Sequence, residues 1–210
     1  GMSITGLIGY PVSHSLSPRI HSYWIAEHGL EAEYKLFTTP PPRLRQTILH
    51  MRKKNVTGFN ITVPHKQAVI EYLDGLDDTA QRIGAVNTVM RKGDTLIGTN
   101  TDAYGFITNL RHGLGDLAPY FQHVVLLGAG GATRAALLAL IEAGAKTITL
   151  TNRTQEKAEA IEQAFREAFG IDENSAKLTF QVGNTSAESL GVQIKSVKTN
   201  NIYANQTLTV

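Results

Sequence analysis

Apolar residues in the first half of the chain come in short runs that glycine, proline and polar turns interrupt. This pattern is typical of alternating strands and helices. Strand-like runs cover residues 4–9, 33–38, 57–63, 85–91 and 95–100. Helical spacing covers residues 17–29, 42–54, 66–73, 76–83 and 101–113. Ser17 as N-cap and Pro18 as the first helical residue predict the start of the first helix. The turn at residues 92–94 predicts a hairpin between the last two strands.

The pattern of apolar and polar residues changes after residue 122. Residues 124–127 are wholly apolar, as expected for a parallel strand that is covered on both faces. A glycine-rich loop, an alanine- and leucine-rich helix to about residue 142, a strand over 147–151 and a helix over 155–170 follow. This order predicts a βαβ unit with one further helix. We therefore divide the chain into residues 3–103, a linker helix and loop over 104–121, and residues 122–210, and expect an α/β fold in both large parts.

Composition narrows the class of protein. The 210 residues are 42% hydrophobic and 18% charged, with a formal net charge of +2. This balance suits a globular core and argues against a nucleic-acid or polybasic membrane surface. The chain has no cysteine, so disulfides and thiolate metal sites are excluded. The histidines show no ligand spacing, so no metal is expected. With no secretory signal and no apolar stretch of spanning length, we expect a cytoplasmic protein.

The glycine-rich loop is the first candidate for chemistry. A strand leads into Gly128-x-Gly130 and then into a helix, so that the backbone can approach a pyrophosphate at the helix N-terminus. Thr133 stands at the third glycine position of the GxGxxG pattern, and a glycine-rich turn without a nucleotide is the alternative. The strand–loop–helix–strand spacing favours the nucleotide. The cofactor-binding candidates here are Gly128, Ala129, Gly130, Gly131 and Ala132.

The end of the next strand indicates which dinucleotide is bound. A carboxylate there would take the ribose hydroxyl of NAD, whereas an arginine accepts the 2′-phosphate of NADP. No carboxylate is present at this strand end, and Arg153 offers a planar fork of donors. An exposed helix start with incidental basic residues is the alternative. We predict NADP (NADPH) as the cofactor, with further contacts from Asn152, Thr154 and Lys157.

Polar patterns also recur near the strand ends of the first half, at residues 13–18, 60–66, 84–88 and 98–105. Taken singly, each has a structural explanation, because Ser-Pro starts helices, and Asn, Thr and Asp cap turns and helices. Together with residues 128–132 and 152–154, and in this order, they closely resemble the shikimate dehydrogenase family over about residues 4 to 160. That family reduces 3-dehydroshikimate to shikimate with NADPH, a step in chorismate and aromatic amino-acid biosynthesis.

The resemblance implies a role for each matching residue. Ser15 and Ser17 would bind the carboxylate of the substrate. The residues around its ring hydroxyls would be Thr62, Lys66, Asn87 and Asp102. Asp78 matches a position associated with the cofactor. Residues 3–103 would then be the substrate-binding domain and 122–210 a Rossmann-like NADP-binding domain, with a small molecule as the partner and a homodimer left open.

The chemistry explains these residue types. Hydride reaches a ring carbonyl while a proton must be supplied to its oxygen, and a lysine can supply that proton. Burial lowers the pKa of a lysine, whereas a neighbouring carboxylate raises it, so the two influences oppose each other. We assign Lys66 as the acid/base and Asp102 as its orienting partner.

The resemblance ends near residue 170, and residues 176–210 are an atypical tail rich in Thr, Asn, Ser and Val. The second domain is therefore expected to be incomplete. Three interpretations remain open: a truncated or frameshifted product, a divergent tail that supplies strands, and a chain completed by a partner. Two alternatives to the NADP enzyme also remain, namely a quinate/shikimate dehydrogenase that uses NAD and a non-catalytic remnant that binds substrate or nucleotide.

Overall fold

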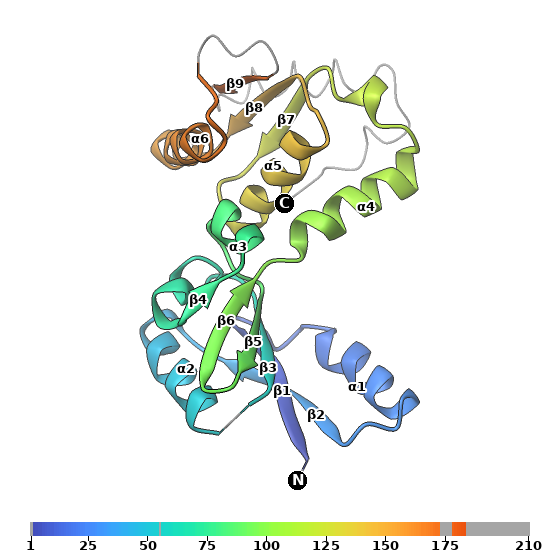
Figure 1. Cartoon of the computed structure of the whole chain (residues 1–210), viewed down its shortest axis with the longest axis vertical. Coiled ribbons are helices and arrows are strands. Elements are labelled where there is room, and N and C mark those ends of the chain that lie inside the picture. Colours follow the sequence, from blue (N-terminus) through green and yellow to red (C-terminus); the bar gives the residue numbers. More distant parts are fainter. Residues whose placement is uncertain (1, 55, 173–177, 184–210) are drawn as a thin grey trace. The chain divides into compact units, whose positions relative to one another are not determined.

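The computed structural model describes residues 2–54, 56–172 and 178–183 and divides into two compact units (Figure 1). The first unit ends at Thr101 and the second begins at Asp102. Each unit has its own sheet and its own buried residues.

The first unit is built on a six-stranded mixed sheet of order β2-β1-β3-β5-β6-β4. Its strands are β1 (Ser3–Gly9), β2 (Ala32–Thr38), β3 (Gly58–Ile61), β4 (Gly75–Leu76), β5 (Thr88–Lys92) and β6 (Thr95–Thr99). Only β5 runs against the others, because it pairs antiparallel with both β3 and β6. The carboxyl ends of the other strands and the amino end of β5 therefore meet at one edge of the sheet.

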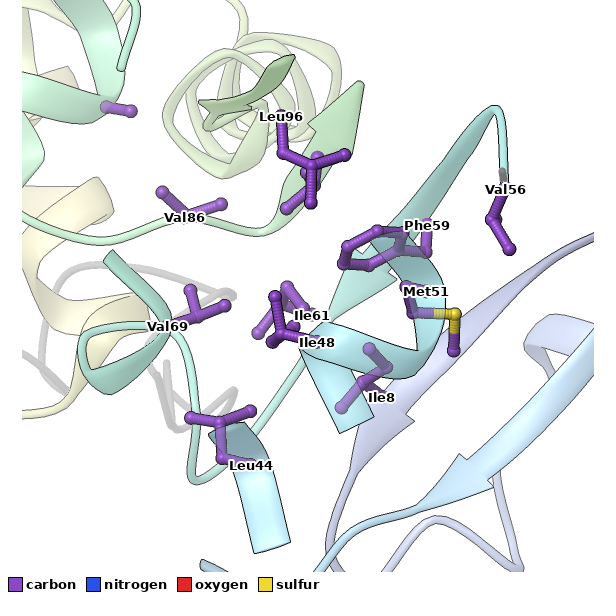
Figure 2. Packing of buried hydrophobic residues seen from close by; sticks show 12 residues of the cluster. Ile8, Leu44, Ile48, Met51, Val56, Phe59, Ile61, Val69, Val86 and Leu96 are labelled. Atoms are coloured by element: carbon purple, nitrogen blue, oxygen red, sulfur yellow. The ribbon is translucent and has the colours of Figure 1, made fainter. Parts of the chain in front are cut away.

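Helices cover both faces of this sheet. They are α1 (Ser17–Glu27), α2 (Leu44–Lys53) and α3 (Asp78–Ile83), with 3₁₀ turns η1 (Pro41–Arg43) and η2 (Ala68–Tyr72). Side chains alternate across a strand, so neighbours on β1 enter different layers. Ile8 joins the large cluster beneath α2, where Leu44, Ile48 and Phe59 lie close together (Figure 2). Leu7 joins the smaller cluster beside α1, with Val12 and Tyr34.

Three local details differ from the predicted elements. Helix α1 has Leu16 as its N-cap, so Ser17 is already the first helical residue. The hydroxyl of Ser15 accepts the Ser17 N–H at 3.2 Å, which moves the polar start signal to the earlier serine. The helix predicted over residues 66–73 is a turn followed by η2. The predicted turn at Gly75 is strand β4, whose backbone is satisfied by pairing with β6.

The second unit contains a parallel sheet of order β7-β8-β9. Its strands are β7 (Val124–Leu127), β8 (Thr147–Thr151) and β9 (Thr179–Val182), and its helices are α4 (Asp102–Leu114), η3 (Ala118–Tyr120), α5 (Gly131–Glu142) and α6 (Gln155–Phe169). In chain order this is the 3-2-1 arrangement of a Rossmann half. Helix α4, which was predicted as part of a linker, packs against α5.

Strand β9 was not among the predicted elements and lies inside the residues expected to be atypical. Arg166 on α6 holds it in place, since its guanidinium donates to the Phe180 carbonyl and lies 5.6 Å from the centre of that ring. Glu162 accepts a second bond from Arg166 at 2.8 Å. The remainder of the predicted tail, residues 176–177 and 184–210, lies outside the described residues.

Candidate functional site

Strand direction gathers the predicted substrate residues of the first unit at one sheet edge. Residues 13–18, the serine segment with Ser15 and Ser17, follow β1. The segment from Thr62 to Lys66 follows β3, and Asn87 directly precedes the antiparallel β5. Strand β6 ends at the same edge, three residues before Asp102 opens α4. Residues far apart in the sequence therefore converge because the chain enters or leaves the sheet on this side.

Backbone hydrogen bonds join the lysine segment to its neighbours. The Thr62 N–H donates to the Ile8 carbonyl at 2.9 Å, which attaches the segment to β1. The Lys66 carbonyl accepts the Val86 N–H at 2.7 Å, and the Ile61 N–H donates to the Asn87 carbonyl at 2.8 Å. Lys66 and Asn87, predicted separately, are thus held in adjacent segments of the first unit.

The His65 side chain holds the segment from Thr62 to Lys66 in place. Its side chain is 1% exposed, and its Nε2 lies 2.6 Å from the Thr39 carbonyl after β2. The Thr39 hydroxyl in turn bonds to Thr47 and to the Phe37 carbonyl. Sequence reasoning gave His65 no role, because a histidine between proline and lysine carries no spacing signal of its own.

The Asn87 side chain holds in place the segment that leads to Asp102. Its Oδ1 accepts the Thr101 N–H at 3.0 Å, and its Nδ2 donates to the Thr101 hydroxyl at 2.8 Å. The Asn87 side chain therefore fixes the residue directly before Asp102. This links the predicted ring-binding amide to the position at which the predicted orienting carboxylate begins α4.

The Tyr34 side chain contacts the serine segment, and nothing in the sequence indicated a role for Tyr34. Burial raises the pKa of Tyr34 to about 12, and a side-chain hydrogen bond from Ser17 partly offsets that rise. The Tyr34 ring stacks on His21 with centroids 4.2 Å apart. Burial also lowers the pKa of His21. Tyr34 thus remains a neutral phenol beneath one of the two predicted carboxylate ligands.

A chain of side-chain hydrogen bonds continues from Tyr34 across the sheet. Its hydroxyl donates to Asn60 Oδ1 at 3.0 Å, and Asn60 Nδ2 donates to the Thr88 hydroxyl at 3.1 Å. Thr88 then donates to Asn87 Oδ1 at 3.1 Å. A signal for Asn60 exists in the sequence, since it is a polar residue between the buried Phe59 and Ile61 and must face the other layer.

Asp78, the predicted cofactor residue of the first unit, lies in the first turn of α3 and is exposed. Its neighbour Asp77 is the N-cap, accepting the Ala80 N–H at 2.8 Å and the Thr99 hydroxyl at 2.5 Å. Strand β4 ends just before these two acids, so Asp78 shares the sheet edge of the substrate residues.

The glycine loop of the second unit leads from β7 into α5. Gly128 leaves β7 with φ of 119°, a conformation open to glycine, and its N–H donates to the Thr151 carbonyl at 2.8 Å. Gly130 is the N-cap of α5, and a Cβ placed there would meet nothing within 4 Å. No atom therefore crowds Gly130 on its Cβ side, and a helix start offers the unpaired backbone N–H groups that an anion requires. Thr133, at the third glycine position, is fully buried in α5.

The carboxyl end of β8 carries the predicted 2′-phosphate group of residues. Asn152 Nδ2 donates to the Thr154 carbonyl at 3.1 Å, which shapes the turn into α6. Thr154 is the N-cap of α6, and both Arg153 and Lys157 are exposed around this helix start. A cationic fork and an ammonium at a helix N-terminus make a chemically suitable anion site.

Membrane spans and metal clusters are not found among the described residues. Within residues 2–54, 56–172 and 178–183, no helix has the length and apolarity to cross a bilayer. The same part of the chain holds no group of three or more His, Asp or Glu residues placed to bind a metal ion.

Comparison with known proteins identifies the family. Residues 7–89 match the model of the shikimate dehydrogenase substrate binding domain, and residues 116–204 match the model named shikimate / quinate 5-dehydrogenase. The chain belongs to the shikimate dehydrogenase family. The second match extends past residue 170, where the resemblance was expected to end, so the family similarity continues into the atypical tail.

Individual relatives agree with this assignment. The chain is 46% identical to the shikimate dehydrogenase (NADP(+)) of Paramagnetospirillum magneticum, over 74% of this chain and 56% of that protein. The crystal structure of the Aquifex aeolicus shikimate dehydrogenase gives a TM-score of 0.76 at 37% identity, over 91% of this chain and 66% of that one. The Thermus thermophilus enzyme in complex with NADP(H) and shikimate gives 0.69 at 39% identity, over 85% and 62%.

The chain thus spans a little over half the length of the first of these relatives, 56%. The activity, substrate and cofactor of the whole enzymes are therefore proposals for this chain.

Proposed function

We propose that this chain is an NADP-dependent shikimate dehydrogenase, which reversibly reduces 3-dehydroshikimate to shikimate in chorismate and aromatic amino-acid biosynthesis. The observation that carries the proposal is the convergence of Thr62, Lys66 and Asn87 at one sheet edge, with the serine segment beside them. Relatives at 46% and 39% identity, the second in complex with shikimate and NADP(H), support the same substrate and cofactor.

The proposed substrate residues form groups that suit different parts of the substrate. Ser15 and Ser17 bring hydroxyl donors to the start of α1, and these suit the carboxylate of a ring acid. Thr62, Asn87 and Lys66 supply a hydroxyl, an amide and an ammonium on adjacent segments, and these suit ring hydroxyls. Asp102 completes the set as a carboxylate acceptor at the start of α4.

The proton step is assigned to Lys66. In the reducing direction its Nζ donates a proton to the oxygen of the ring carbonyl, and in the oxidising direction it takes the proton from the hydroxyl. Asp102 orients the ammonium and accepts a bond from the reacting hydroxyl. His65 and the Lys66–Val86 backbone bond hold the segment still, so that the flexible lysine stem starts from a fixed backbone.

The cofactor side is assigned to the second unit. Residues 128–132 would hold the pyrophosphate, and Arg153 with Lys157 would hold the 2′-phosphate, with Asn152 and Thr154 shaping that turn. NADPH, when bound, supplies the hydride. Asp78 is retained as a further cofactor contact from the first unit.

The test is a steady-state assay of NADPH formation from shikimate and NADP⁺, followed by absorbance. Turnover that depends on both substrates supports the proposal. The alternative function is binding of shikimate or nucleotide without turnover. Saturable shikimate binding in calorimetry without detectable NADPH formation would select that candidate instead.

The choice of NADP over NAD is tested by the variant Arg153→Ala. Loss of a charge-assisted fork to the 2′-phosphate should weaken NADP⁺ binding by about ten- to a hundredfold. Binding of NAD⁺, which lacks that phosphate, should be unchanged and serves as the internal control. Equal weakening of both dinucleotides would contradict the assignment, and a wild-type preference for NAD⁺ would favour the quinate/shikimate alternative.

We further propose a cytoplasmic location, which the absence of cysteine from the sequence supports as suited to a reducing compartment. A homodimer is the corresponding proposal for the assembly, and the molar mass in light scattering tests it.

A further inference from the structure

Tyr34 is a buried hydroxyl that the proposed proton step does not use. It projects from β2 in the small cluster with Leu7 and Val12, and its side chain is 6% exposed. To reach Asn60 on β3 it crosses β1, the strand between them. A phenol in this position needs a partner for its oxygen and its proton, and it has one on each side: Ser17 and Asn60.

The hydrogen bonds that leave Tyr34 all point the same way. Tyr34 donates to Asn60, Asn60 donates to Thr88, and Thr88 donates to Asn87. Asn87 then donates to the Thr101 hydroxyl. Hydrogen bonds in such a series polarise one another, so the state of the first donor affects the rest.

A carboxylate at the serine segment would change the first link. A carboxylate only accepts hydrogen bonds, so the single Ser17 proton must turn toward it to bind it. The Ser17 oxygen then needs a donor on its other side, and the Tyr34 hydroxyl is the group already in contact with it.

We propose that Tyr34 is a positioning residue for substrate carboxylate binding, donating its proton to Ser17 when the Ser17 hydroxyl turns to the carboxylate. This inference rests on the proposed function. Without a substrate, the Tyr34 proton is directed to Asn60 instead. Tyr34 can therefore donate its proton either to Ser17 or to Asn60. In this way it connects the carboxylate end of the site with the Asn60–Thr88–Asn87 series.

Burial suits Tyr34 to this role. Because its pKa is raised to about 12, the phenol keeps its proton near neutral pH, where shikimate carries a carboxylate. The variant Tyr34→Phe removes only the hydroxyl and keeps the ring that stacks on His21 at 4.2 Å. The variant therefore separates hydrogen bonding from packing.

The experiment is a double-mutant cycle on the full chain, with shikimate affinity measured by calorimetry and folding checked by thermal unfolding. The proteins are wild type, Tyr34→Phe, Ser17→Ala and the double variant. We expect Tyr34→Phe to weaken shikimate binding about tenfold, and to have an effect within about twofold when Ser17 is already alanine. Tyr23→Phe, at a tyrosine on α1 that is 63% exposed, is the matched control and should bind as wild type does.

The outcomes distinguish this inference from the proposed function. Equal effects of Tyr34→Phe with and without the Ser17 hydroxyl would indicate a merely structural role and overturn the inference, as would an unchanged affinity. Wild-type chain that binds no shikimate would overturn the proposed function as well. A second readout needs no Tyr34 variant: shikimate should perturb the tyrosine absorbance of wild type and leave that of Ser17→Ala unchanged, and the opposite result contradicts the inference.

Discussion

At the scale of single residues, the candidate site is built from polar side chains that also hold the backbone. Asn87 clamps Thr101, His65 is pinned to the Thr39 carbonyl, and Tyr34 supports Ser17. A residue that binds a neighbouring segment through its side chain fixes a position as well as a chemical group. Precision of this kind is what a site needs when it must place a proton donor beside a hydride acceptor.

The residue assigned to proton transfer gives the first prediction. Lys66→Ala should lower the turnover number for shikimate oxidation by about a hundredfold or more, since general acid–base catalysis contributes on that order. Shikimate affinity in calorimetry should change little. Lys54→Ala, at an exposed lysine after α2, is the control and should keep wild-type turnover. Near-normal turnover of Lys66→Ala would show that another group moves the proton.

Asp74 gives a prediction for stability against pH. Its carboxylate accepts the Leu96 N–H at 2.6 Å and the Arg52 guanidinium at 2.7 Å, and these contacts lower its pKa. A lowered pKa stabilises the fold above the ordinary aspartate range, and that contribution is lost as the pH falls.

Asp74→Asn should therefore lower the melting temperature near neutral pH, and the difference from wild type should shrink below about pH 4. The exposed Asp94 in the hairpin turn provides the control variant Asp94→Asn, which should show a smaller difference at either pH. A difference for Asp74→Asn that stays constant down to about pH 3, roughly one unit below the ordinary value, would contradict the argument.

At the scale of elements, strand β1 can end against the Thr62 segment because its last residue, Gly9, has no side chain. A Cβ at Gly9 would lie 2.4 Å from Thr62 Cγ2 and 2.5 Å from Val12 Cγ1. The Thr62 segment therefore packs directly on the strand backbone. The glycine sets how closely the substrate segment after β3 can approach β1.

Gly9→Ala should push Thr62 away and destabilise the first unit by about 2 kcal/mol, as overpacking of a filled site does. Shikimate affinity should fall with it. Gly113→Ala is the matched control, because a Cβ there meets nothing within 4 Å and the residue lies in helix α4. That variant should be neutral or stabilising by up to about 1 kcal/mol. Urea unfolding measures both, and equal stability of the two variants would refute the packing argument.

At the scale of the whole molecule, the two units carry different sets of proposed site residues. The proposed substrate residues of the first unit lie at one sheet edge, and the proposed cofactor residues of the second unit lie at the starts of α5 and α6. Each has its own buried cluster, such as Ile8, Ile48 and Phe59 in the first. We expect the first unit to fold by itself, because its core is complete without the second.

A fragment of residues 1–101 should therefore unfold in urea with a single cooperative transition and show dispersed amide resonances. Phe59→Ala in the same fragment, at a residue 2% exposed, should cost about 3–5 kcal/mol and abolish or strongly weaken that transition. A fragment with collapsed, random-coil resonances would show that the first unit depends on the second.

Prediction from the sequence succeeded where the signal is local. The apolar run at 124–127, the glycines at 128–131 and the strand at 147–151 lie in the structure where the pattern placed them. Strands β4 and β9 were missed, because Gly75 resembles a turn and the polar–apolar alternation over residues 179–182 is only four residues long. Both strands form only when a neighbouring strand supplies their hydrogen bonds.

For this chain, the sequence by itself determined the residue types, the order of motifs, and through them the family. It also placed Lys66 at a strand end and Arg153 at a helix start, since both positions follow from local spacing. Only the tertiary structure decided that β5 pairs antiparallel with β3, which brings Asn87 to the edge where β1 and β3 end. It alone placed Tyr34 across β1 from Asn60, because contacts between distant strands depend on sheet order and register.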